Sequence, residues 1–231
     1  MKKSVLLTIT LATLLASCST TRYVSAELKD APLDSIPVLE PYTTVFWANS
    51  ALQEEFSDSL TIIAHEQLLD VLETPSPLPT GKVLYMQDGE FYEEIGADVA
   101  ELFAHCYGNR RKVAETAPLP TSLREFMTDN ELPYLAVIYQ DGFSRSAGNY
   151  AIQIGAAVFE AIFTTIFSLG TYTAYSIPTK DMLTFRVLIA DLYADRIAYF
   201  NRVETEHSPT ERYNNTYYLQ RAFGPYPRNN K

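Results

Sequence analysis

The sequence predicts an α/β domain in which a mixed β-sheet is flanked by helices. Amphipathic helical spacing alternates along the chain with short β-branched or aromatic runs, and the run Tyr134–Tyr139 is apolar almost without a break. A run of this kind is typical of a strand that helices cover on both faces. Two alternating runs near the carboxyl end predict an antiparallel hairpin. We therefore expect a single domain over residues 38–224.

The first part of this domain predicts a strand followed by a helix. Tyr42–Trp47 is a β-branched and aromatic run that fits a pleated surface. Apolar residues at helical spacing then predict a helix that continues to about Glu73. Two capping patterns, at Ser50 and at Ser57, compete for the start of this helix.

The next part predicts a short strand at Lys82–Met86 and two further helices. The first helix is expected from Glu90 to about Tyr107, with Gly108 as its C′ residue. The second is expected to start at the capping box of Ser122 and to end near Leu132.

The carboxyl-terminal part predicts the hairpin and a last helix. The two strands of the hairpin are Met182–Leu192 and Ile197–Glu204. Ser208 followed by a proline and, three residues on, a glutamate predicts a helix from about Pro209 to Phe223. We expect three residues of this helix to face inward at least in part: Tyr213, Tyr217 and Leu219.

A stretch of low charge interrupts the domain and is treated as an apolar insertion over residues 147–178. From residue 146 to residue 179 the only charged side chain is Glu160. Small residues recur every four positions, a spacing that lets helices approach closely. Three interpretations stay open: a buried core helix, an element that packs on another protomer or enters the bilayer in part, and a transmembrane helix. The candidate interface residues are Ala147, Ala151, Gly155, Phe159, Phe163 and Phe167.

The first eighteen residues have the pattern of a bacterial lipoprotein signal. Lys2 and Lys3 precede the apolar run Val5–Leu15, which is shorter than the roughly 20 residues that a spanning helix needs. Leu15-Ala16-Ser17-Cys18 resembles a lipobox, which implies cleavage after residue 17 and acylation of Cys18, with palmitate as one chain. Two acyl chains form a stable membrane anchor. An ordinary signal peptide with an incidental cysteine is the alternative.

The remaining chain has the charge of an acidic envelope protein. Without Lys2 and Lys3, 16 basic and 28 acidic residues give a net charge of −12, which argues against nucleic-acid partners. Ser19 follows the lipobox in place of an aspartate, and the lipoprotein pattern then implies the outer membrane, with the periplasmic face favoured over the cell surface. Residues 18–37 are expected to form a flexible tether, and residues 225–231 a disordered tail.

No catalytic residue, metal site or cofactor is predicted. His65-Glu66 begins like a zinc-protease motif, but Leu69 stands where the second histidine belongs. His105 and Cys106 are neighbours in a predicted helix and point about 100° apart, so a packed, inert thiol is favoured over a nucleophile–base pair. An acidic cluster at a helix start is interpreted as favourable charge at the positive end of the helix dipole. Its members are Asp88, Glu90, Glu93 and Glu94.

The order of elements resembles a group of envelope lipoproteins. A helix that ends in Leu132-Pro133-Tyr134 leads into an apolar strand, a low-charge insertion follows, and Leu188-Ile189-Ala190-Asp191 lies in the hairpin. This order is similar to the fold shared by the TolB amino-terminal domain and the curli secretion channel lipoprotein. Where that group has an aspartate, a small residue and a glycine, this chain has Ala194-Asp195-Arg196. The resemblance implies a domain that assembles with partners, and it implies no catalytic residues.

These patterns together predict a non-enzymatic, lipid-anchored component of an envelope assembly, trafficking or secretion complex. Self-association through residues 147–178 is part of this hypothesis. The alternative is a lipid-anchored periplasmic or surface hydrolase, or a ligand-binding protein, of unknown substrate.

Overall fold

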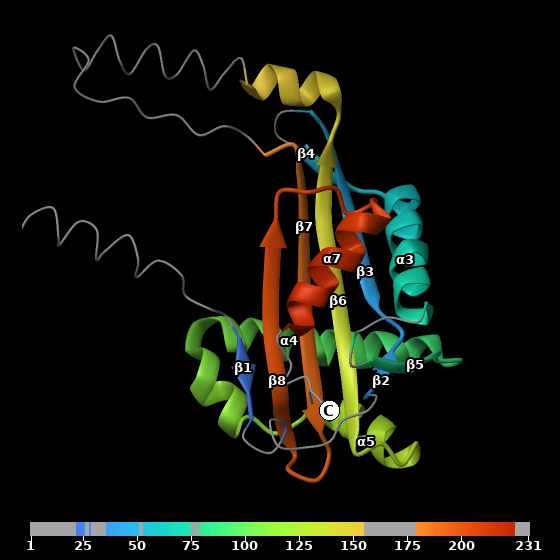
Figure 1. Ribbon diagram of the computed structural model, residues 1–231, viewed down its shortest axis with the longest axis vertical. Helices are drawn as coiled ribbons and strands as arrows, with labels where there is room; N and C mark the ends of the chain where they lie inside the picture. Colours follow the sequence, from blue (N-terminus) through green and yellow to red (C-terminus); the bar gives the residue numbers. More distant parts are fainter. Residues whose placement is uncertain are drawn as a thin grey trace, which may run out of the picture.

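The computed structural model describes residues 22–25, 28, 36–50, 53–74, 78, 80–154 and 179–224, without the side chains of residues 49–50, 53–54 and 107–115. The strands in this part form one mixed sheet that carries helices on both faces (Figure 1). The predicted fold class, α/β with a mixed sheet flanked by helices, is therefore confirmed.

The sheet has eight strands among the described residues. They are β1 (Tyr23–Val24), β2 (Ile36–Leu39), β3 (Tyr42–Ser50), β4 (Gln53–Phe56), β5 (Thr80–Leu84), β6 (Tyr134–Arg145), β7 (Asp181–Asp191) and β8 (Arg196–Thr205). Their order across the sheet is β1-β8-β7-β6-β2-β5, while β3 lies between β6 and β4. Strands β2 and β3 pair with β6 in parallel, and β7 and β8 form the predicted antiparallel hairpin.

Strands β2 and β3 form one line along β6 that a bulge divides. Val38 pairs with Ala136, and Tyr42 pairs with Tyr139. Three residues separate the pairs on the β2–β3 side and two on the β6 side, so this line holds one extra residue. On the side away from β6, the strand that pairs with this line differs on the two sides of the bulge. It is β5 beside β2 and β4 beside β3.

In the described part of the chain, two helices cover each face of the sheet. Helices α3 (Asp58–Glu73) and α7 (Arg212–Phe223) pack on one face and share one hydrophobic core with it, to which they contribute Leu68 and Leu219. Helices α4 (Gly89–Thr116) and α5 (Thr121–Asp129) pack on the other face, around Ile95 and Leu123. The sheet is thus the middle of three layers, because both of its faces are apolar and each must be shielded from water.

The predicted helix α3 and the predicted buried strand are confirmed. Of the two competing helix starts, Ser57 is used, because its side chain accepts a hydrogen bond from the Leu60 amide at 3.4 Å. The apolar run at the start of β6 is fully buried from Leu135 to Ile138. Strand β6 continues beyond the predicted end at Tyr139, through Gly142, to Arg145.

Two predicted helix boundaries on the α4–α5 face are wrong. Helix α4 does not end at Gly108 but continues to Thr116. A glycine inside a helix costs only about 1 kcal/mol, and the residues that follow include good helix formers. Ser122 does not cap α5, whose N-cap is Pro120. The Ser122 hydroxyl donates instead to the Asp98 carboxylate of α4 at 2.6 Å, so a tertiary hydrogen bond replaces the predicted capping bond.

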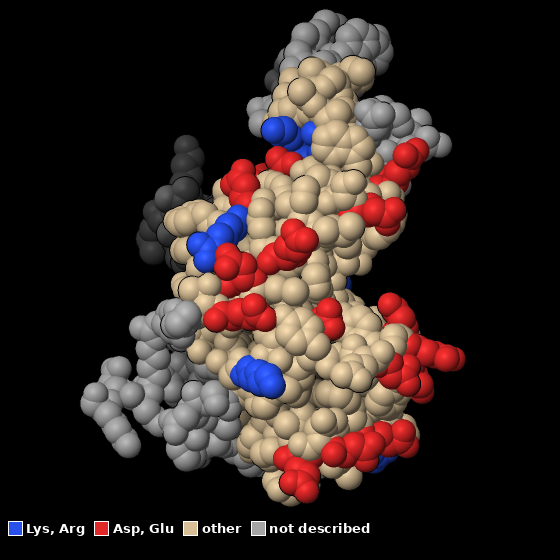
Figure 2. All heavy atoms as spheres, turned by 90° about the vertical axis from the view of Figure 1, so that its right-hand side faces the viewer, with Lys and Arg blue, Asp and Glu red and all other residues tan. Residues whose placement is uncertain are grey.

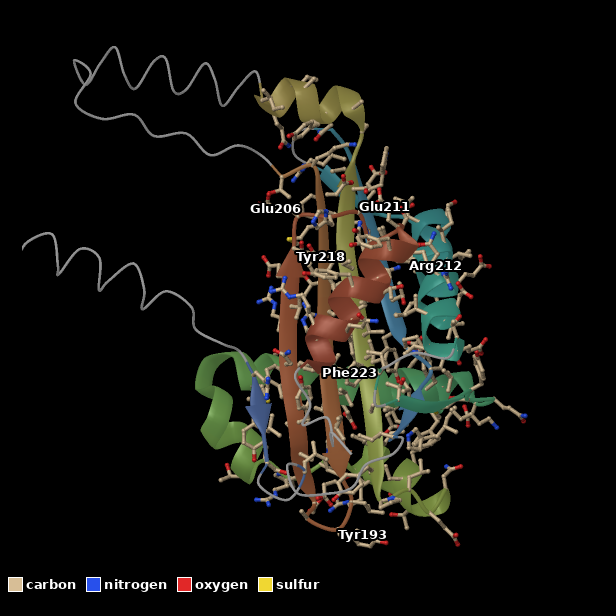
Figure 3. All side chains as sticks on the ribbon, in the orientation of Figure 1. Tyr193, Glu206, Glu211, Arg212, Tyr218 and Phe223 are labelled. Atoms are coloured by element: carbon tan, nitrogen blue, oxygen red, sulfur yellow. The ribbon has the colours of Figure 1, made fainter. Side chains whose placement is uncertain are left out.

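The predicted start and inward face of the last helix are also corrected. Helix α7 begins at Arg212 rather than at Pro209, whose carbonyl accepts hydrogen bonds from Gln140 and Asn215 side chains at 3.1 and 3.2 Å. Those tertiary bonds hold the turn before the helix. Tyr213 is 77% exposed and Tyr217 is 45% exposed, so neither packs inward, whereas Leu219 is fully buried. Figure 3 shows Arg212 and Phe223 at the two ends of this helix.

Part of the segment expected as a tether, residues 18–37, is joined to the domain. Tyr23 and Val24 form β1 and pair with Phe200 and Tyr199 of β8. Leu28 is fully buried in the α3–α7 core. The expected tether is thus interrupted by contacts of its own apolar residues. The predicted tail, residues 225–231, lies outside the described residues.

Candidate interaction site at the tip of the sheet

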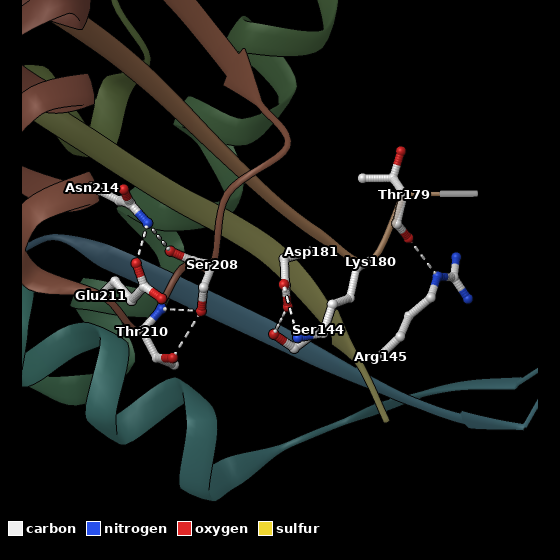
Figure 4. Close-up of polar contacts among 9 residues, drawn as sticks. All are labelled: Ser144, Arg145, Thr179, Lys180, Asp181, Ser208, Thr210, Glu211 and Asn214. Carbon is white, nitrogen blue, oxygen red and sulfur yellow. Dashed lines mark hydrogen bonds and ion pairs between the residues drawn. The ribbon is translucent and has the colours of Figure 1, made fainter. Parts of the chain in front are cut away.

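The insertion leaves and rejoins the domain at one end of the sheet, here called the tip, where β6 ends and β7 begins. The Arg145 amide donates to the Lys180 carbonyl at 3.0 Å, and the Arg145 Nε donates to the Thr179 carbonyl at 2.9 Å (Figure 4). One residue closer to the sheet, the Ser144 hydroxyl donates to the Asp181 carboxylate at 2.5 Å. These bonds hold the two ends of the insertion side by side.

Basic side chains border the insertion at both of its ends. The Arg145 guanidinium lies 4.7 Å from the centre of the Phe143 ring, a cation–π contact. The Lys180 Nζ lies 3.9 Å from the Asp181 carboxylate, and its side chain is 55% exposed. The low-charge stretch predicted from the sequence therefore begins and ends beside two adjacent positive charges.

A helical segment over residues 147–154 continues from the end of β6. Ser146 is its cap, because the Ser146 hydroxyl accepts a hydrogen bond from the Asn149 amide at 3.1 Å. The Ser146 amide donates to the Ala48 carbonyl of β3 at 3.2 Å. The segment therefore starts directly beside the β3–β4 hairpin, as Figure 1 also shows.

The structure describes two of the six predicted interface residues. Ala147 and Ala151 are both exposed on the helical segment, and the adjacent Ile152 is 65% exposed. Four predicted interface residues lie outside the described residues: Gly155, Phe159, Phe163 and Phe167. Cys18, the predicted lipidation site, also lies outside them. Within the described part of the chain, no helix is both long enough and apolar enough to span a bilayer.

An apolar row crosses the sheet next to this segment and was not predicted from the sequence. Its members, here called the tip row, are Phe56, Phe46, Phe143 and Met182, which are opposite one another in the registers of β4, β3, β6 and β7. Phe46 is 37% exposed and Phe56 is 56% exposed, with their ring centres 6.3 Å apart. The alternating residues Tyr42, Thr44 and Phe46 indicate one face of a strand in the sequence. They do not indicate that the residues opposite Phe46 on the neighbouring strands are aromatic.

Below the tip row, helix α4 covers the same face of the sheet. The Tyr42 ring stacks between Tyr92 of α4 and Tyr139 of β6, at 4.3 and 4.7 Å between ring centres. This close packing requires Gly96, where an added Cβ would lie 2.6 Å from the Tyr42 ring. Burial raises the pKa values of all three tyrosines.

Charged side chains of β6, β7 and β8 lie beside the tyrosine stack, where Arg186 is opposite Tyr139, and between the stack and the tip row, where Asp141 lies. The Arg186 guanidinium contacts the Asp141 carboxylate at 2.5 Å, and Arg202 pairs with Glu204. Burial raises the pKa of Asp141, and the neighbouring Arg186 and Arg202 oppose this shift. The two ion pairs balance the like charges of Arg186 and Arg202, which are directly opposite on β7 and β8.

The arrangement around His65 is the most enzyme-like geometry in the described residues. The His65 Nδ1 lies 3.4 Å from the Thr43 hydroxyl, and its Nε2 lies 3.6 Å from the Glu40 carboxylate. A nucleophile and its base are expected within about 2.6–3.2 Å of one another. Thr43 also lies on the face of β3 that α3 covers, beside the His65 side chain of that helix. Both distances are longer than the hydrogen bonds expected between an activated hydroxyl, its base and the group that orients the base.

Three further residues with chemically reactive side chains lie in helix α4 or directly before it. Cys106 is fully buried, and burial raises the pKa of its thiol to about 11, so the thiolate that a nucleophile needs is disfavoured. The His105 ring contacts the Glu101 carbonyl within the same helix at 2.9 Å. The Asp88 carboxylate accepts two amide hydrogen bonds at the start of α4, as the helix-dipole interpretation predicts. No group of three potential ligands for a metal occurs among the described residues.

Comparison with protein-family models, with curated proteins and with solved structures found no match to this chain. The family resemblance drawn from the order of elements therefore stays a prediction.

Proposed function

We propose that the protein is a lipid-anchored component of a cell-envelope assembly, trafficking or secretion complex. In this proposal acyl chains on Cys18 hold it at the outer membrane, and the tip joins it to further copies of itself. It acts through these contacts rather than through catalysis.

Exposed apolar surface at the tip is the observation that supports the proposal. Phe56, Phe46 and Ile152 are each more than a third exposed, and they lie where the low-charge insertion joins the sheet. Large apolar side chains that gather in one place usually mark a contact surface. Aromatic residues are also enriched at protein interfaces.

Light scattering after size-exclusion chromatography tests the self-association. The full-length protein, extracted in detergent, is expected to elute as an oligomer. The double variant F46S/F56S and a deletion of residues 150–170 should each shift it toward the monomer. Tyr193→Ser is the control, because Tyr193 is an aromatic residue with 85% exposure and lies in the turn between β7 and β8, at the opposite end of the sheet from the tip (Figure 3).

A wild-type protein that is monomeric would contradict the self-association, as would an oligomer that survives the deletion unchanged. The membrane anchor has a separate test, since labelled palmitate should enter the wild-type protein and not Cys18→Ala. Incorporation that persists in Cys18→Ala would refute the lipidation site.

A further inference from the structure

The chain that follows the lipidation site is fixed to the domain after a very short distance. The Arg22 guanidinium donates to the Gly224 carbonyl at the end of α7 at 3.0 Å. Tyr23 and Val24 pair with β8, and the Ser25 amide donates to the Ala198 carbonyl at 2.8 Å. Only residues 19–21 separate Cys18 from Arg22. An extended chain covers at most about 3.6 Å per residue, so the Cα atoms of Cys18 and Arg22 are at most about 14 Å apart.

This distance is short compared with the domain. Strand β6 alone has 12 residues, which correspond to about 40 Å of sheet. The headgroup region of one leaflet is about 5–8 Å thick. A domain that is held within about 14 Å of an acylated residue, at one edge of its sheet, must keep that edge close to the headgroups.

Basic residues occur around this edge. Arg22 lies at the start of β1, and the exposed Arg221 lies in the last turn of α7, beside Gly224. Basic side chains of this kind are attracted to anionic phospholipid surfaces.

The opposite side of the molecule is acidic. From Asp58 to Glu101 the chain contains ten acidic residues and a single basic one, Lys82. Figure 2 shows the side of the molecule that lies away from β1, where acidic side chains are more frequent than basic ones. The net charge of −12 is therefore unevenly distributed, and an anionic bilayer would repel the acidic side.

We propose that the edge formed by β1 and the end of α7, with Arg22 and Arg221, lies against the anionic phospholipid surface of the bilayer. The acidic side around α3 and the first half of α4 faces away from the membrane. This inference rests on the proposed acylation of Cys18.

Fluorescence quenching in vesicles tests the orientation. A nitrobenzoxadiazole label is placed on the full-length, acylated protein at Glu204→Cys, on the outer strand β8, or at Glu66→Cys on α3. Both positions are exposed, both changes remove one negative charge, and the fully buried Cys106 should stay unlabelled. The vesicles contain phosphatidylcholine and phosphatidylglycerol at 3:1, with a nitroxide on the headgroups of some of the lipids.

Quenching at position 204 should exceed quenching at position 66 at least threefold. Insertion of twelve Gly and Ser residues after Thr21 adds roughly 40 Å of reach, and in vesicles of phosphatidylcholine alone it should bring the two values close together. Equal quenching at both positions in the unmodified protein would overturn the inference. A contrast that the inserted residues leave unchanged in neutral vesicles would also overturn it, because the short chain would not be its cause.

Flotation of the same vesicles separates this inference from the proposed function. Wild-type protein that does not float with the lipid would refute the anchor itself, and the orientation with it. Protein that floats and is equally quenched at both positions would refute only the orientation. A contrast that is smaller in anionic than in neutral vesicles would overturn the role assigned to the basic edge.

Discussion

Gly142 of β6 offers the sharpest test of the packing that supports the tip. An added Cβ at this position would lie 2.2 Å from the Met182 carbonyl oxygen of β7 and 3.2 Å from the Pro209 side chain. Contacts below 3.0 Å are essentially never found for real Cβ atoms, so β6 and β7 would have to separate by about 0.8 Å. The Met182 carbonyl belongs to the backbone and cannot rotate away as a side chain can. The hydrogen bonds between β6 and β7 near Gly142 must therefore lengthen or break.

The size of the effect follows from two terms. Overpacking in a well-packed region costs about 1–3 kcal/mol. The loss of one hydrogen bond of the β6–β7 ladder adds about 1 kcal/mol. Gly142→Ala should therefore lower the free energy of unfolding by about 2–4 kcal/mol, out of the roughly 5–15 kcal/mol that is usual for a domain.

Urea denaturation of the detergent-solubilised protein, followed by the fluorescence of Trp47, measures this change. Gly148→Ala is the matched control, because nothing lies within 4 Å of an added Cβ there and the residue is helical. This control should be neutral or stabilising by about 0.5–1 kcal/mol. A Gly142→Ala variant within about 0.5 kcal/mol of wild type would refute the described contact between β6 and β7.

Three further predictions concern the core and its titrating groups. Leu219→Ala should cost about 2–5 kcal/mol in urea denaturation, whereas Tyr213→Ala, on the same helix but 77% exposed, should cost less than about 0.5 kcal/mol; similar losses would contradict the observed face of α7. Cys106 should react with a thiol reagent at pH 8 only after urea unfolds the protein, and fast reaction under native conditions would show that the thiol is not buried. Burial raises the pKa of Tyr199 to about 12 from 10.0, so this phenol makes the protein less stable as the pH rises from about 10 to about 12. Tyr199→Phe should lose less stability between pH 9 and pH 11 than wild type, and an equal loss would argue against this burial.

Elements with a strong local pattern were predictable from the sequence. The spacing of apolar residues in α3 and the unbroken apolar run of β6 each have one dominant cause, burial, and both were located correctly. The hairpin of β7 and β8 was also predicted, although its turn has no glycine. Asp195 takes the left-handed conformation there, with φ of 47°, and its carboxylate accepts bonds from the Leu119 amide and the Arg124 guanidinium. A tertiary contact thus supports the turn.

Boundaries set by distant residues could not be predicted from local sequence. Ser122 has the pattern of a cap, yet its hydroxyl bonds to Asp98, which is 24 residues away. The residues after Ser208 have the pattern of a helix start, yet Gln140 and Asn215 bind the Pro209 carbonyl and delay the helix. In both cases a buried polar group finds a better partner in the tertiary structure than in its own segment.

The candidate site was predictable only in part for the same reason. The low charge of residues 147–178 is a property of the sequence, but the exposure of Ala147 and Ala151 could not be predicted from it, because a buried core helix was among the open interpretations. The tip row depends on the pairing of four strands that are far apart in the chain, and no local pattern reports that pairing. The attachment of β1 also escaped prediction, because two residues are too few to show a periodic pattern.

Mass spectrometry of the mature amino terminus tests the membrane anchor most directly. If Cys18 is the lipidation site, the first residue of the purified protein is Cys18, and its mass includes a diacylglycerol group. A terminal peptide that begins at Met1, or one that carries an unmodified Cys18 thiol, would contradict both the anchor and the orientation inferred from it.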